Sequence, residues 1–158
     1  MGNYIKTFES FVETEGRLFW GTIAAGVIPI CTTTKRILVG LRSDEVEEPG
    51  TWGSFGGKLD IDEGIDETIK EAVLRELEEE TGYCGNIELV DAFVYKHGSF
   101  EYHNFFGLVS SEFEPELNWE NESAEWFTYD ELIVLSDKHF GLVSLLKNDG
   151  DLLKSFLK

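Results

Sequence analysis

Residues 56–83 read GGKLDIDEGIDETIKEAVLRELEEETGY, a glycine pair followed by an acidic loop, a carboxylate-rich helical pattern and a Thr-Gly stop. Apolar side chains recur in it at three- and four-residue spacing; they are Ile65, Ile69, Ala72, Val73 and Leu77. This spacing predicts a helix over residues 66–81, because acidic residues suit its first turn and Gly82 suits the position after its last turn.

Several glutamates of this helix fall on its apolar side. A helix turns by about 100° per residue, so its apolar residues define one arc that faces inward. Glu76 and Glu80 project into the middle of that arc, and Glu79 lies at its margin. At least two carboxylates are therefore expected to point toward the protein.

Inward carboxylates are costly for three reasons. Carboxylates at positions i and i+4 repel, the C-terminal end of a helix carries partial negative charge, and a buried unpaired carboxylate loses its hydration. Arg75 can balance one charge, and the remainder favour a hard divalent cation. Because the ligands are oxygens, Mg²⁺ or Mn²⁺ fits better than zinc. The alternative is a solvated acidic face over residues 78–80, which the angular positions and the flanking glycines disfavour.

The segment resembles the signature of the Nudix hydrolases, which reads Gly, five residues, Glu, seven residues, Arg-Glu, an aliphatic, any residue, Glu-Glu, any residue, Gly and an aliphatic. The residues that match in register are Arg75, Glu76, Leu77, Glu79, Glu80 and Gly82. Glu67 lies eight residues before Arg75, where the first glutamate of the signature belongs.

The segment departs from the signature at two places. Nine residues separate Gly57 from Glu67, four more than in the family, so Glu63 competes with Glu67 for the role of first glutamate. Tyr83 stands where the signature ends in an aliphatic residue. The longer loop affects the glycine end of the signature and leaves the helical half unchanged.

The resemblance implies a fold and a set of metal ligands. The Nudix fold is an α/β/α sandwich with a mixed central β-sheet, and strands before and after one acidic helix, followed by a C-terminal helix, suggest the same architecture. The metal ligands that the resemblance implies are Glu76, Glu79 and Glu80, with Glu67 and the backbone of Gly57 as further contacts. Arg75 is expected to orient one of the glutamates through a charge-assisted hydrogen bond.

Strand and helix patterns place the rest of the chain. Strands are expected over residues 17–31, 36–42, 87–95, 100–110 and 125–128. The first two, joined by a turn, predict a hairpin-like pair. An acidic loop is expected over residues 111–124, and helical turns over residues 130–135 and 139–147, with a tail that extends the last of these helices or docks against it.

Composition limits the size and the partners of the protein. A chain of 158 residues with 42% hydrophobic content is long enough for one compact core, so a single domain over residues 1–158 is expected. Such a domain could also form a homodimer. The net charge of −18 argues against nonspecific binding to nucleic acid or anionic membranes. A phosphate-bearing substrate would need metal ions to bridge it to such a surface.

The cysteines and the N-terminus indicate a cytoplasmic protein. Cys31 and Cys84 are the only cysteines, and neither forms a Cys-x-x-Cys pair, so both are expected as reduced thiols. The first residues carry no apolar segment of the signal-peptide kind. The longest apolar run, residues 23–31, is too short to span a bilayer.

Candidate substrate-binding residues lie outside the signature. Arg42 ends a strand pattern, and the resemblance implies an arginine near the substrate phosphates there; a solvated strand-end arginine is the alternative. His103 could contact a phosphate or a base, although a lone histidine is more often structural or solvated. Trp119 is the loop aromatic best suited to stack on a nucleobase.

A further acid lies in the loop before the last predicted strand. In the family a glutamate there often serves as general base or extra metal ligand, and Glu120 and Glu122 fall in that place. Glu122 is the preferred candidate in this loop, and a generic solvated acidic loop is the alternative. The general base is either a glutamate of the signature or Glu122. The catalytic residues that the resemblance implies are thus Arg75, Glu76, Glu79 and Glu122.

The sequence therefore predicts a Mg²⁺- or Mn²⁺-dependent hydrolase of a phosphoanhydride bond in a small nucleoside-diphosphate compound. Nucleoside triphosphates, ADP-ribose and dinucleoside polyphosphates are candidate substrates. The rival hypothesis is a nucleotide-sensing or protein-binding module that kept the fold and lost turnover. Intact signature carboxylates disfavour it, and only the longer loop favours it.

Overall fold

The computed structural model of the protein describes residues 23–59 and 67–158. Glu63 therefore lies outside the described residues, as do the start of the first predicted strand and residue 66 of the predicted helix. The elements are β1 (Ile23–Cys31), β2 (Arg36–Arg42), β3 (Trp52–Gly53), β4 (Phe55–Lys58), α2 (Ile69–Thr81), β5 (Glu88–His97), β6 (Phe100–Val109), β7 (Asn121–Phe127), α3 (Tyr129–Val134) and α4 (Phe140–Ser155).

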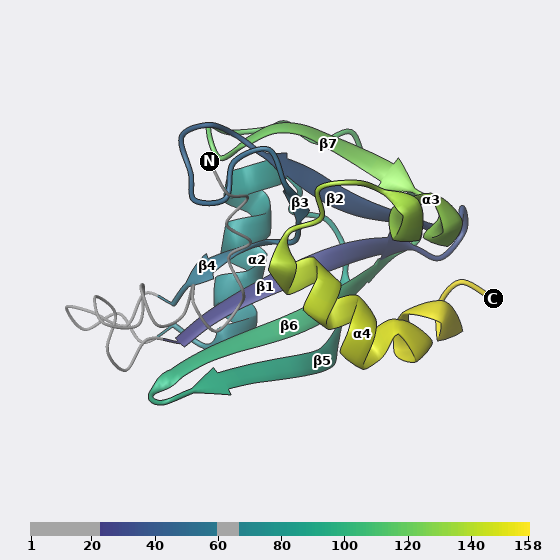
Figure 1. Cartoon of the computed structure of the whole chain (residues 1–158). Coiled ribbons are helices and arrows are strands. Elements are labelled where there is room, and N and C mark those ends of the chain that lie inside the picture. The colour runs from purple at the N-terminus through teal and green to yellow at the C-terminus, as the bar shows by residue number, and fades with distance from the viewer. Residues whose placement is uncertain (1–22, 60–66) are drawn as a thin grey trace.

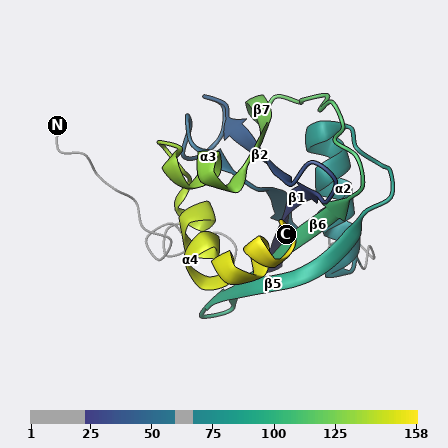
Figure 2. The ribbon, with the colours of Figure 1, turned by 90° about the vertical axis from the view of Figure 1, so that its right-hand side faces the viewer.

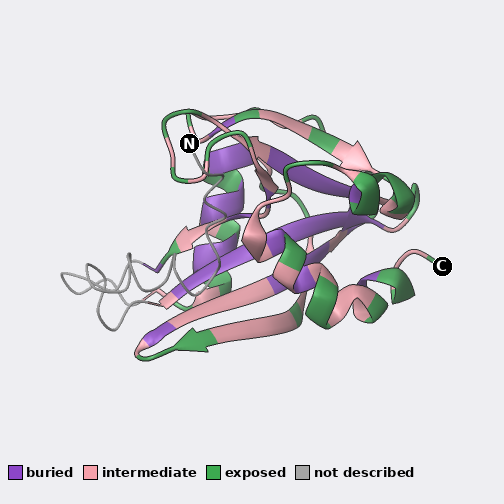
Figure 3. Cartoon of the chain, viewed as in Figure 1, coloured by how far each residue is buried: buried purple, intermediate pink, exposed green. Residues whose placement is uncertain are grey.

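The strands form one mixed sheet in the order β3-β2-β1-β6-β5, with β4 also paired to β1 and β7 to β2. β1 and β6 run parallel over their whole length, whereas the other pairs are antiparallel. The predicted hairpin-like pair is present, because β1 and β2 are antiparallel neighbours joined by a short turn. These pairings place β1 at the centre, and both of its faces are buried (Figure 3).

Helices cover the two faces of this sheet (Figure 1). Figure 2 shows α2 on one side and α3 and α4 on the other. Ala25 and Val27 of β1 pack into the core cluster beneath α2. Ile28 and Ile30 of the same strand pack into the second cluster, beneath α3 and α4. Side chains that alternate along β1 therefore pack into two cores, one on each face of the sheet. The predicted α/β/α sandwich is confirmed.

Local signals fix the ends of α2. The Thr68 side chain accepts a hydrogen bond from the Glu71 backbone N at 3.2 Å, so the helix begins at Ile69, and residues 67 and 68 of the predicted helix precede it. Gly82 has a left-handed φ of 76°, and its N–H donates to the Glu78 carbonyl at 2.7 Å. The predicted glycine stop is correct, because this conformation is easy for glycine alone.

The structure defines the boundaries of two predicted elements. β7 begins at Asn121, so the end of the segment predicted as a loop is a strand paired to β2. α4 runs past residue 147 to Ser155 with a kink at Asp149, so the tail extends the helix, one of the two arrangements expected for it. None of the helices in the described ranges is both long and apolar enough to cross a membrane.

Candidate active site

The helix α2 packs against β4, where Gly57 lies close to the Glu76 carboxylate. Glu76 and Glu80 are only 8% and 4% exposed, as their angular positions indicate, whereas Glu79 is exposed. Burial raises the pKa of Glu76; the Arg75 charge opposes this shift, and Glu79 and Glu120 add to it. The site therefore concentrates negative charge in a desolvated place.

Arg75 forms hydrogen bonds with three glutamates, one just before α2 and two on it. Its Nε and Nη2 donate to the two oxygens of Glu67 at 2.7 and 3.1 Å. Its Nη1 donates to Glu76 Oε1 at 2.9 Å and lies 3.3 Å from both oxygens of Glu79. Nη2 also reaches the Lys58 carbonyl at 3.1 Å. These hydrogen bonds, chiefly the one to Glu67, raise the pKa of Arg75, so it is a permanent cation that orients three acids.

Glu80 is the acid with the least compensation. Its Oε1 accepts a hydrogen bond from Asn121 Nδ2 at 3.2 Å, while its Oε2 is buried and has no hydrogen-bond partner within the described ranges. Burial raises the pKa of Glu80 well above its ordinary value, and the charges of Glu120 and Glu76 raise it further, whereas hydrogen bonds from Asn121 and the Gly56 backbone oppose the shift. An orphaned carboxylate oxygen among other acids is a costly arrangement that a cation would relieve.

The structure brings Glu120, and not the preferred Glu122, against this cluster. Burial raises the pKa of Glu120, and the charge of Arg42 opposes that shift. Glu122 is exposed. An irregularity in the pairing of β7 with β2, between Leu41 and Arg42, turns Glu122 outward, whereas Glu120 lies in the loop just before β7. Sequence alternation alone carries no signal of this irregularity.

The loop that carries Glu120 is fastened at both ends of the site. The Glu116 N–H donates to the Thr81 carbonyl at 2.7 Å, at the last residue of α2. Ser43, just after β2, donates from its hydroxyl to the Trp119 carbonyl at 2.6 Å and from its N–H to the Glu120 carbonyl at 3.0 Å. The loop is therefore held to α2 at Glu116, and the backbone of Trp119 and Glu120 is held by Ser43, just after β2.

Tyr83, the departure from the signature, also holds this loop. Its ring stacks on Phe113 with centroids 4.1 Å apart, and Phe113 meets Trp126 edge to face at 5.4 Å. The Trp126 Nε1 donates to the Phe113 carbonyl at 3.1 Å. The Tyr83 ring thus has an aromatic partner at the position where the signature has an aliphatic residue.

Gly57 lies directly against a carboxylate of α2. A Cβ at this position would come within 2.5 Å of Glu76 Oε1, so only glycine lets the backbone approach so closely. The neighbouring Lys58 carbonyl is the one that Arg75 contacts. The glycine end of the segment thus meets the acidic face of the helix despite the longer loop.

Residues 21–148 match the family model described as the NUDIX domain. The chain belongs to the Nudix family. A curated relative, "Putative nudix hydrolase 1" of Caenorhabditis elegans, is 33% identical over 84 residues, which are 52% of this chain and 22% of that protein. The chain thus matches less than a quarter of the length of that relative.

Solved Nudix structures share the fold. A Nudix hydrolase from M. smegmatis, RenU, superposes with a TM-score of 0.70 at 18% identity, over 84% of this chain and 85% of that chain. An Ap4A hydrolase from C. elegans has a TM-score of 0.62 at 18% identity, over 85% of this chain and 98% of that chain. At these identities the likeness shows the fold.

The described residues of this Nudix protein fit a hard divalent cation. Among residues 23–59 and 67–158, no three acidic, histidine or cysteine side chains are gathered closely enough to hold a metal ion by themselves. The orphaned Glu80 Oε2 nevertheless lies beside the charges of Glu76 and Glu120, and all of these donors are oxygens. Mg²⁺ retains several waters and shares substrate phosphates, so it does not require a closed protein cage.

Arg42 lies close to Glu120 in space, and Trp119 directly precedes it in the chain. The Arg42 Nε donates to the Glu47 carbonyl at 2.6 Å, and its charge affects both Glu120 and Tyr102. Trp119 is 59% exposed and directly precedes Glu120. Tyr102 was not among the predicted site residues; burial raises its pKa, and the charges of Glu80 and Glu76 also act on it.

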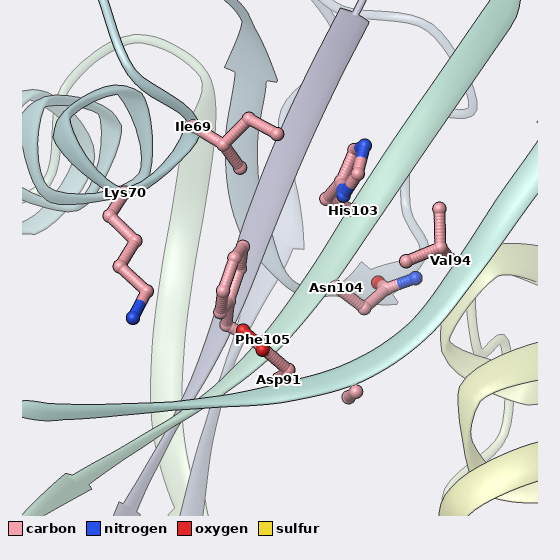
Figure 4. A pocket seen from close by; sticks show the side chains of 8 residues that line it. Ile69, Lys70, Asp91, Val94, His103, Asn104 and Phe105 are labelled. Atoms are coloured by element: carbon pink, nitrogen blue, oxygen red, sulfur yellow. The ribbon is translucent and has the colours of Figure 1, made fainter.

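His103 is the candidate substrate-binding residue that lies away from the signature glutamates Glu76, Glu79 and Glu80. It lines a recess of about 300 Å³ between the N-terminal end of α2 and strands β5 and β6, together with Ile69, Lys70, Asp91, Ala92, Val94, Asn104 and Phe105 (Figure 4). Its Nε2 lies 2.9 Å from Glu101 Oε2. Ile69 and Glu76 are two helical turns apart on α2, or about 10 Å along the axis. His103 therefore belongs to a different part of the surface from the signature glutamates.

Proposed function

We propose that the protein is a Mg²⁺- or Mn²⁺-dependent hydrolase that cleaves a phosphoanhydride bond in a small compound built on a nucleoside diphosphate. The observation that carries the proposal is the Glu80 carboxylate, which is buried, has one oxygen without a partner and has Glu76 and Glu120 as charged neighbours. A buried carboxylate with an unpaired oxygen destabilises the folded protein, and a bound cation would offset this cost.

The signature residues take distinct roles in this proposal. Glu76, Glu79 and Glu80 would hold the metal, with Glu67 and the Gly57 backbone as further contacts. Bound Mg²⁺ neutralises pyrophosphate charge and lowers the pKa of a coordinated water. Arg75 fixes the orientation of Glu67, Glu76 and Glu79 by the hydrogen bonds described above.

Glu120 takes the role of general base in this proposal, in place of Glu122. Its side chain faces the acids, and burial raises its pKa, which brings a carboxylate closer to the proton affinity that a general base needs near neutral pH. Glu122 points to solvent on the other side of the strand irregularity. The role of Glu120 is to accept the proton of the attacking water.

Arg42 and Trp119 are proposed to contact the substrate, because the charge of Arg42 acts on Glu120 and the exposed Trp119 directly precedes it in the chain. Arg42 suits a phosphate oxygen and Trp119 a nucleobase. His103 could contact only a part of the substrate that extends toward the recess at the N-terminal end of α2. The net charge of −18 weighs against long nucleic acids and favours a small nucleotide that brings its own metal ions.

A cytoplasmic location is proposed with this activity. Cys31 and Cys84 are both free thiols, as expected in a reducing compartment. Nucleotide substrates with bound Mg²⁺ are available there. A homodimer is compatible with this proposal and is not needed for the site, since every residue invoked belongs to one chain.

A phosphate-release screen tests the proposal. Purified protein would be incubated with nucleoside triphosphates, ADP-ribose and dinucleoside polyphosphates, each with Mg²⁺, with Mn²⁺ and with a chelator. We expect metal-dependent turnover of at least one small nucleotide. The control is Glu80→Gln, which keeps the shape of the side chain and removes its charge. No turnover of any compound, or equal turnover by Glu80→Gln, would contradict the proposal and favour a silent binding module.

A further inference from the structure

Asn121 is a buried polar residue, 6% exposed, that the proposed reaction does not yet use. Its Nδ2 donates to Glu80 Oε1 at 3.2 Å, while Glu80 Oε2 has no partner. We propose that Asn121 is a positioning residue, which fixes the Glu80 carboxylate through one oxygen and leaves the other available to the metal ion. This inference rests on the proposed function of the site.

A β-bulge places Asn121 in this position. Ala124 and Trp126 pack toward the core beneath α2, and because side chains alternate along a strand, a regular strand would continue with Glu122 facing inward. The pairing runs from Leu41 with Ser123 to Arg42 with Asn121, so β7 carries one more residue than β2 at this point. The extra residue reverses the alternation, and Asn121 faces inward where Glu122 otherwise would.

Gly40 provides the space for the Asn121 side chain. A Cβ at Gly40 would come within 2.6 Å of Asn121 Oδ1 and 2.8 Å of Phe55 Cε1. The amide is therefore confined between β2 and the helix α2. Because an ionised carboxylate oxygen only accepts hydrogen bonds, the amide nitrogen must face Glu80, and the amide oxygen faces Gly40.

A neutral donor suits this place better than a charged residue. Arg75 already supplies a cation to Glu67, Glu76 and Glu79. A second cation beside Glu80 would compete with a metal ion for its charge, and a further acid would add repulsion. An amide orients the carboxylate and leaves its negative charge intact, as the outer hydrogen-bond partners of metal ligands commonly do.

Binding of Mn²⁺ to the metal-free protein, followed by electron paramagnetic resonance, tests this inference without any substrate. We expect Asn121→Ala to weaken Mn²⁺ binding roughly 10- to 100-fold, the usual effect of removing an outer partner of a metal ligand. The matched control is Asn104→Ala, which removes an amide that donates to the Phe93 carbonyl at 2.9 Å, away from the acids. Asn104→Ala should bind Mn²⁺ as the original protein does. Circular dichroism checks that each variant is folded.

A double variant separates a positioning role from a structural one. If Asn121 acts through Glu80, Asn121→Ala should cause little further loss of Mn²⁺ affinity in a protein that already carries Glu80→Gln. Unchanged Mn²⁺ binding by Asn121→Ala, an equal loss in Asn104→Ala, or a full further loss in the double variant would overturn the inference. If Glu80→Gln itself leaves Mn²⁺ binding unchanged, the proposed metal site fails, and that result is distinct from a failure of Asn121 alone.

Discussion

Arg75 donates two parallel hydrogen bonds to Glu67, from Nε to Oε1 at 2.7 Å and from Nη2 to Oε2 at 3.1 Å. Glu67 precedes the N-cap of α2, whereas Arg75 lies in the second turn of that helix. The same guanidinium contacts Glu76 and Glu79 through Nη1. One planar cation thus connects the end of the loop before α2 to the acidic face of the helix, a task that depends on its fork shape.

Replacement of Arg75 by lysine should therefore impair catalysis although the charge is kept. An ammonium group cannot bind Glu67 at two points and reach Glu76 together, so the acids lose their fixed orientation. We expect a loss of turnover of roughly 10- to 100-fold, measured as kcat on the substrate that the screen identifies. Arg36→Lys is the control, because Arg36 makes a similar two-point pair with Glu112 away from the site. Equal losses in the two variants would contradict the assigned role.

Two glutamine variants should distinguish the candidates for the general base. Glu120→Gln removes a carboxylate that faces the acid cluster, and Glu122→Gln changes one that is exposed. We expect Glu120→Gln to lower kcat roughly 10²- to 10⁴-fold, the usual contribution of a general base, and to lower it far more than Glu122→Gln does. The opposite order would return the role to Glu122.

Gly57 should tolerate no side chain. The Cβ of alanine would lie 2.5 Å from Glu76 Oε1, so Gly57→Ala must displace this carboxylate or the backbone of β4. We expect weaker Mn²⁺ binding and lower turnover than in the original protein. Gly150→Ala is the control, since a Cβ there meets no atom within 4 Å. Wild-type Mn²⁺ affinity in Gly57→Ala would show that Glu76 need not stay in its place.

The pH dependence of stability should reveal the buried acids in the metal-free protein. The pKa of Glu80 is raised in the folded state, chiefly by burial, and the pKa values of Glu76 and Glu120 shift in the same direction. The folded protein thus binds protons more tightly than the unfolded chain does. The resulting stability is fully present below the ordinary carboxyl pKa, and it is lost as the pH rises through the raised folded values.

Thermal unfolding at a series of pH values without metal measures this effect. We expect Tm to fall as the pH rises from about 5 to about 8, and to fall less steeply in Glu80→Gln. Mg²⁺ should restore Tm mainly at the higher pH, because the cation takes the place of the proton. An identical slope in the two proteins would show that Glu80 does not carry the effect.

The stack of Tyr83 on Phe113 should contribute to stability. Tyr83→Leu, which restores the aliphatic residue of the signature, removes a ring pair with a centroid distance of 4.1 Å. We expect a loss of about 1 to 2 kcal/mol in the free energy of unfolding, measured with urea. Tyr83→Phe keeps the ring and loses only the hydroxyl bond to the Asn86 carbonyl, so it should lose less. A more stable Tyr83→Leu would be evidence against the stack.

The parts of the structure that depend on local pattern were predictable from the sequence. The apolar arc of α2, its Gly82 stop and the inward direction of Glu76 and Glu80 all follow from helical periodicity. Thr68 as the N-cap was missed, because acidic residues before it looked equally suited to a first turn. Pairing between distant segments is not encoded in such patterns.

The choice between Glu120 and Glu122 shows this limit. A strand pattern gives alternation but not the position of a bulge, which depends on how β7 meets β2. Asn121 could not be found for the same reason, since its inward direction follows from that bulge and from the missing side chain at Gly40. His103 lies in a strand near the acids in sequence order, yet the sheet carries it to the other end of α2.

The parallel pairing of β1 with β6 has a consequence for biosynthesis. Ile23 pairs with Glu101 and Cys31 with Val109. In the same way, β2 pairs with β7, which comes much later in the chain. β1 and β2 can pair with each other and with β3 and β4 early, but each lacks one sheet neighbour until β6 and β7 have been translated. The acidic helix emerges before those two strands, when the sheet is still incomplete. Cooperative folding late in translation, or after release, is the order of events that this topology imposes.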